Sequence, residues 1–153
     1  MAPSPTTFAL RNVGGLAIAA GSLFVAVGVG AWFTVTKQLR DENITLPGNA
    51  PVLAGKPVQG PVSAYVEAGV IKNNAERGAG GRTFADVSAA LREVDGSSEE
   101  AAELRKHSAS LATGASLRTS LMTSVLAYGV SVFAGGLGAF LVIVGSQLRK
   151  ADD

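Results

Sequence analysis

Two long runs without a charged residue constrain this chain most. They extend from Asn12 to Thr36 and from Thr119 to Leu148. A helix needs about 20 predominantly apolar residues to cross the hydrocarbon core of a membrane, and both runs exceed that length. We therefore predict an all-α membrane protein with transmembrane helices at residues 12–36 and 119–148.

Cations lie on both sides of each run: Arg11 and Lys37 flank the first, and Arg118, Arg149 and Lys150 flank the second. Two spans joined by a central segment form a hairpin, so both termini are expected on one side of the membrane. The tails, 1–11 and 149–153, are too short to form domains. Any function therefore lies in the bilayer or in the segment 37–118.

A cleaved signal peptide is the alternative interpretation of the first run. The apolar core of a signal peptide usually has about 7–15 residues and precedes a cleavage site with small residues. The run from Asn12 to Thr36 is longer, and no clear A-x-A site follows it. We expect the segment to be retained, with Trp32 and Phe33 at the membrane–water interface.

Small residues recur every seven positions in both runs. A seven-residue period keeps one helix face turned toward a partner helix, and small side chains allow two backbones to approach closely in lipid. We expect these two seams to pack on each other as an antiparallel hairpin. A dimer seam, or the general abundance of glycine in transmembrane helices, are the alternatives. The residues are Gly14, Gly21 and Gly28 in the first run, and Ser124, Ser131, Gly138 and Gly145 in the second.

The central segment opens with a stretch rich in proline and glycine, residues 41–60. Such residues favour turns, and the short apolar pieces between them favour an ordered, irregular loop over disorder. A short edge strand is expected at Ile44–Leu46. The loop presents a possible interaction surface, for which the residues to test are Val52, Leu53, Val58 and Tyr65; a lid over the helical insert is the alternative.

Three helices are expected after this loop, at about 61–77, 83–95 and 98–118. Pro61 suits a first helical turn, and Thr83 with Asp86 resembles a capping box. Ser97 with Glu100 resembles a second capping box, and no helix breaker except Gly114 separates it from the second span. The apolar stripes predicted for the first two helices are Val62, Tyr65, Val66 and Val70, and Phe84, Val87, Leu91 and Val94.

Composition excludes several function classes. The formal net charge is only +1, and the central segment carries ten basic and ten acidic residues, so no basic face for nucleic acid is indicated. With one histidine, His107, and no cysteine, the chain lacks the ligands of the usual zinc and non-haem iron sites. We expect no catalytic residue, no metal site, no cofactor and no small-molecule substrate.

Four strings resemble a family of small two-span actinobacterial membrane proteins: "DENITL", "APVLAGKPVQGPVSAYVEAGVI", "GGRTFADV" and "ASLRTSLMTSVLAYGV". The resemblance extends from about Gly15 to Arg149. Members are often labelled aromatic ring-opening dioxygenases, which implies a metal-dependent oxygenase, but the ligands for such a metal are absent here. The resemblance also implies cytoplasmic termini and an extracytoplasmic central segment, in the inner (plasma) membrane.

We therefore expect a non-catalytic accessory or scaffold subunit of an envelope or respiratory membrane complex. Its expected partners are the lipid bilayer and either another membrane protein or further copies of itself. A small oligomeric transport or pore protein is a further alternative. Since neither span has an ionisable residue, only a weak polar stripe of Thr119, Thr123 and Ser131 could line such a path.

Overall fold

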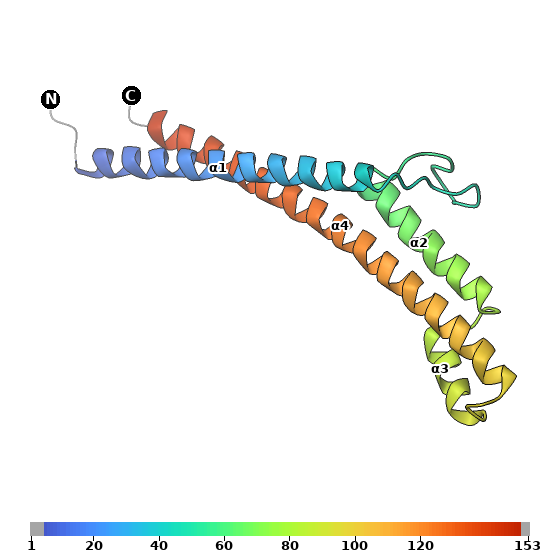
Figure 1. The fold of residues 1–153 in the computed structure, drawn as a ribbon. Helices are drawn as coiled ribbons and strands as arrows, with labels where there is room; N and C mark the ends of the chain where they lie inside the picture. The colour runs from blue at the N-terminus through green and yellow to red at the C-terminus, as the bar shows by residue number, and fades with distance from the viewer. Residues whose placement is uncertain (1–4, 151–153) are drawn as a thin grey trace. The chain divides into compact units, whose positions relative to one another are not determined.

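The computed structural model describes residues 5–150, with side chains from residue 10 on (Figure 1). Within this range the chain forms helices and connecting loops, which confirms the all-α fold class. The helices are α1 (Pro5–Asp41), α2 (Pro61–Gly78), α3 (Phe84–Glu93) and α4 (Glu99–Lys150). The strand expected at Ile44–Leu46 is not formed; Thr45 makes only an isolated antiparallel bridge with Pro57.

Two of these helices, α1 and α4, are long and apolar enough to cross a membrane. The candidate spans lie within Leu10–Asp41 and Glu99–Lys150, and each contains a window with a mean hydropathy of 2.0. Contacts divide the chain into two compact units. One contains α1 up to Gln38 and α4 from Leu126 onward, and the other extends from Leu39 to Val125.

The second unit is built around the first half of α4. Its apolar core contains Ala79, Val87, Leu104 and Leu111, and Leu91 and Val94 pack against it from the side of α3. Gly114 does not break α4. A Cβ atom at this position would lie 3.0 Å from Cβ of Ala75, so α2 and α4 are in close contact there.

The apolar stripe predicted for α2 is wrong for Val62 and Tyr65, whose side chains are both 62% exposed. The face that α2 buries consists mainly of small residues, Ser63, Ala64 and Ala68, together with Glu67 and Val70. Small side chains allow the close approach of α2 to α4, and larger ones would hold the helices apart.

Hydrogen bonds at the helix ends explain where α2 stops and α3 begins. Gly80 and Gly81 have φ angles of +67° and +80°, a backbone conformation that glycine adopts readily, and they end the turn after α2. Thr83 and Asp86 form the predicted capping box: the Asp86 carboxylate accepts from the Thr83 backbone N–H at 2.8 Å, and the Thr83 hydroxyl accepts from the Asp86 N–H.

The capping box predicted for α4 at Ser97 and Glu100 is wrong, because the Ser97 hydroxyl bonds elsewhere. Ser98 caps the helix, since its hydroxyl accepts from the backbone N–H of Ala101 at 3.1 Å. The Ser97 hydroxyl instead donates to the carboxylate of Asp95, whose oxygen also accepts from the Ser97 N–H. Asp95 thus holds Ser97 in a local turn, and Ser98 takes the capping position.

Candidate functional site

The small residues of α1 and α4 come into contact in antiparallel order. A Cβ atom on Gly14 would lie 2.8 Å from the carbonyl oxygen of Gly145, and one on Gly21 would lie 2.5 Å from that of Gly138. A Cβ on Gly28 would lie 2.6 Å from the carbonyl oxygen of Ser131. Since real Cβ atoms do not approach other atoms so closely, the two backbones can touch only because glycine occupies these positions.

One residue of the predicted seam is not among these contacts. Ser124 belongs to the unit 39–125, and its hydroxyl donates to the carbonyl oxygen of Ser120 at 3.3 Å. We therefore restrict the seam to six residues, three from each helix. These are Gly14, Gly21, Gly28, Ser131, Gly138 and Gly145.

Beyond Gly28 the contact between the helices changes from backbone to aromatic. The rings of Trp32 and Tyr128 meet edge to face, with centroids 4.5 Å apart and planes at 66°. The Tyr128 side chain is only 1% exposed, and its hydroxyl lies 2.8 Å from the Thr36 hydroxyl. Sequence reasoning missed this cluster, although a tyrosine in an uncharged run needs a polar partner when buried and could have been flagged for that reason.

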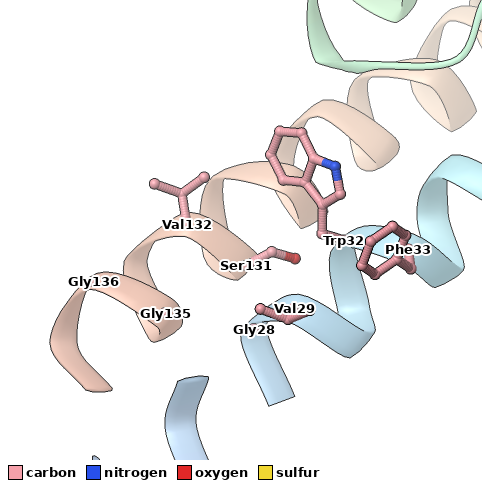
Figure 2. Close-up of a pocket in the computed structure, with 8 residues that line it drawn as sticks. All are labelled: Gly28, Val29, Trp32, Phe33, Ser131, Val132, Gly135 and Gly136. Carbon is pink, nitrogen blue, oxygen red and sulfur yellow. The ribbon is translucent and has the colours of Figure 1, made fainter. Parts of the chain in front are cut away.

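An apolar groove with a volume of about 430 Å³ lies next to Trp32. Figure 2 shows the residues that line it. The hydroxyl of Ser131, the only alcohol in its wall, already donates to the carbonyl oxygen of Ala127 at 2.8 Å. The groove is therefore suited to hydrocarbon. It is lined by Gly28, Val29, Trp32 and Phe33 from α1, and by Ser131, Val132, Gly135 and Gly136 from α4.

In the other unit, the loop before α2 is closed by backbone hydrogen bonds. The N–H of Val58 donates to the carbonyl of Ile44, and the N–H of Leu46 donates to that of Lys56, both at 2.9 Å. Leu46 and Val58 are each 1% exposed. Val58 is therefore an anchor of the loop, and its assignment to an exposed interaction surface is wrong, because the loop folds back and buries it.

The other residues assigned to that surface are exposed. Val52 and Leu53 lie at the tip of the loop with exposed fractions of 54% and 42%, and Tyr65 lies on the open face of α2. Leu53 has a φ angle of +58°, in the left-handed region that costs a residue with a Cβ about 1–2 kcal/mol. The loop thus holds an apolar side chain in solvent at a strained backbone position.

Hydrogen bonds also join the loop to one face of α2. The loop residue Asn49 donates from the side-chain amide to Asn74 at 2.9 Å, and the N–H of Gln59 donates to the Ser63 hydroxyl at 3.1 Å. Glu67 lies between Ser63 and Asn74 on the same helix face, given the helical repeat. These two bonds join the loop to α2 at both ends of this face.

Glu67 is a buried carboxyl group. Its side chain is 8% exposed, and its Oε2 atom has no hydrogen-bond partner among the described residues. Burial raises the pKa of the Glu67 carboxyl above its ordinary value of 4.5, because the charged form loses hydration. The sequence places a glutamate on a helix face but does not show that this face is buried.

The side chain of His107 is half-buried, with its Nδ1 atom 3.5 Å from the Arg82 guanidinium. Over the described residues, no group of three histidine or acidic side chains lies close enough together to hold a metal ion. The features described above are thus a helix-packing seam, an apolar groove, an exposed loop tip and the buried carboxyl group of Glu67.

Comparison of the chain with known proteins found no matching family model, no similar curated protein and no similar solved structure.

Proposed function

We propose that the chain is a non-catalytic integral membrane protein that serves as an accessory or scaffold subunit of an envelope or respiratory membrane complex. In this proposal α1 and the second half of α4 form a transmembrane hairpin, and residues 37–118 form a helical insert outside the cytoplasm. Both termini then lie in the cytoplasm, an orientation that the resemblance to the actinobacterial two-span family implies.

Exposure of the apolar side chains supports the membrane part of the proposal. Only 11% of the most apolar 18-residue stretch of α1 is buried, and only 17% of the corresponding stretch of α4. Leu16, Leu23 and Phe133 are each 65% exposed or more. A core helix of a soluble protein buries such side chains, whereas lipid covers them in a membrane.

The observation that carries the accessory role is the tip of the loop, where Val52 and Leu53 are exposed on a frame anchored by Leu46 and Val58. An exposed apolar residue in a strained backbone conformation is unfavourable in isolation and persists where the surrounding structure imposes it. A partner that covers Leu53 would regain the apolar burial energy, about 25 cal/mol per Å² of area removed from water.

The test is purification of the tagged full chain from its native membrane in a mild detergent, followed by mass spectrometry. We expect stoichiometric recovery of one complex from the unmodified chain and its loss from a Leu53→Ala, Tyr65→Ala variant. Val62→Ala, at an equally exposed position of α2, is the matched control and should retain the complex. Recovery of the chain alone, as a monomer or a homo-oligomer, would contradict the accessory role.

A pore formed by several copies is less well supported. The hydroxyls that could line it each donate to the carbonyl oxygen four residues earlier in α4, at 2.9 Å for Thr119, 2.9 Å for Thr123 and 2.8 Å for Ser131. Their donor hydrogens are therefore used within the helix, leaving only acceptor capacity toward a water-filled path.

A further inference from the structure

A basic cleft lies where the start of α1 meets the end of α4. It has a volume of about 620 Å³ and is lined by Arg11, Asn12, Gly15, Leu16 and Arg149. The seam explains why residues from the two ends of the chain share this cleft. Gly14 and Gly145 are in contact, and the Cγ atom of Arg149 lies so near Gly14 that a Cβ there would be 2.9 Å from it.

Both guanidinium groups are without a counter-ion in the described part of the chain. Neither Arg11 nor Arg149 has a hydrogen bond or ion pair there, and no carboxylate among the described residues lines the cleft. Two like charges at one cleft repel each other, and an anion between them removes that cost. The cleft is thus electrostatically suited to a negative ligand.

The position of the cleft selects the kind of anion. Arg11 directly precedes the uncharged run of α1, and Arg149 directly follows that of α4. In a membrane, therefore, both lie at the boundary between headgroups and hydrocarbon. Leu16, which is 72% exposed, continues the wall of the cleft one turn further toward the apolar part of the helix. The lining thus changes from cationic to apolar in the direction that a phospholipid changes from phosphate to acyl chain.

We propose that this cleft binds one anionic phospholipid, with its phosphate between Arg11 and Arg149 and an acyl chain along Leu16. Guanidinium groups pair with phosphate oxygens in a two-bond geometry, and basic pockets between membrane helices suit anionic headgroups. The Asn12 side chain supplies amide donors and an acceptor for the headgroup hydroxyls or the glycerol ester. A zwitterionic lipid is disfavoured because its cationic headgroup would meet the two arginines.

The test is native mass spectrometry of the purified full chain in detergent micelles, titrated with dioleoylphosphatidylglycerol or dioleoylphosphatidylcholine. The two lipids carry the same acyl chains, so a difference in affinity reports the headgroup. We expect phosphatidylglycerol to bind at least about tenfold more tightly and Arg149→Gln to remove about tenfold of its affinity. Glutamine keeps the Cγ atom that packs on Gly14, and circular dichroism checks that the variant is helical.

Lys150→Gln is the matched control, since it removes the same charge from the next residue, which does not line the cleft. This change should alter the affinity by less than about threefold. Equal losses for Arg149→Gln and Lys150→Gln, or equal binding of the two lipids, would overturn the proposal. Arg149→Lys keeps the charge and removes the two-bond geometry, so it should bind phosphatidylglycerol more weakly than the unmodified chain.

Inorganic phosphate separates a lipid site from a site for free anions. We expect millimolar phosphate not to displace bound phosphatidylglycerol, because phosphate lacks the acyl chain. Displacement by phosphate alone, with Leu16→Ser binding the lipid normally, would assign the cleft to a soluble anion and contradict the proposal. The assay uses purified protein without a partner, so its outcome is independent of the proposed accessory role.

Discussion

Glycine at residue 21 allows α1 and α4 to touch, because a Cβ there would lie 2.5 Å from the carbonyl oxygen of Gly138. Gly21→Ala should therefore destabilise the helix pair by about 1–3 kcal/mol. At Gly30 an added Cβ atom would have no neighbour within 4 Å, so alanine there should be neutral or stabilising by up to about 1 kcal/mol. Trp32 is the sole tryptophan and packs on Tyr128, so its fluorescence during titration with SDS can measure both changes. Identical midpoints for the two variants would contradict the seam.

Glu67 should make the stability of the unit 39–125 depend on pH. Burial raises its pKa in the folded state, so the folded chain holds this proton more tightly than the unfolded chain does. The resulting stability is fully present below the ordinary pKa of 4.5 and is lost as the pH rises through the raised value. The stability of the Glu67→Gln variant relative to that of the unmodified chain should therefore increase as the pH rises toward neutral. Thermal unfolding of both proteins in stepped buffers measures this, and parallel curves would rule it out.

At the scale of helices and loops, the start of α4 depends on one hydroxyl group. Ser98→Ala removes the acceptor for the Ala101 N–H and should cost about 1 kcal/mol of stability. Ser97→Ala is the comparison, since the backbone N–H of Ser97 still bonds to Asp95 after the change and only the hydroxyl bond is lost. Hydrogen exchange of the first turn of α4 should accelerate more for Ser98→Ala. The reverse order would favour the capping box predicted from the sequence.

Elements with strong local signals could be predicted closely, and those that depend on distant contacts could not. Pro61 and the Thr83–Asp86 pair mark helix starts by chemistry that is local in sequence. The choice between Ser97 and Ser98 depends on where Asp95 directs its oxygen, which the residue pattern does not show. Val58 was misassigned for a related reason: its burial follows from bonds between the two ends of a loop, and no helical or strand period describes that arrangement.

The whole molecule should present its two ends to one side of a membrane and its central segment to the other. In sealed vesicles of uniform orientation, trypsin on the side of the insert should cut at basic residues between Lys37 and Arg118 and spare Arg11 and Arg149. Trypsin on the opposite side should do the reverse. Cleavage of both sets from one side would exclude a hairpin. Peptide mass spectrometry of the protected fragments distinguishes these outcomes.

The same dependence on long-range contacts limits what could be foreseen of the candidate sites. The seven-residue spacing of glycines indicates that a face exists, and the residue pairs follow once the helices are known to be antiparallel. The basic cleft needs that pairing first, because Arg11 and Arg149 are at opposite ends of the chain. The Trp32–Tyr128 contact likewise joins residues from two helices: the second run marks Tyr128 as needing a partner but does not identify that partner.

The seam also constrains how the proposed hairpin can change in length. An inserted residue in one helix advances it by about 1.5 Å and turns it by about 100°, which would direct Cβ atoms into the opposite backbone. Insertions preserve the contact only as whole seven-residue units added to both helices, and each unit adds about 10.5 Å. Insertion of single residues therefore cannot adapt this helix pair to a slightly thicker or thinner bilayer. Such adaptation must occur by tilting of the pair as a body or by deformation of the surrounding lipid.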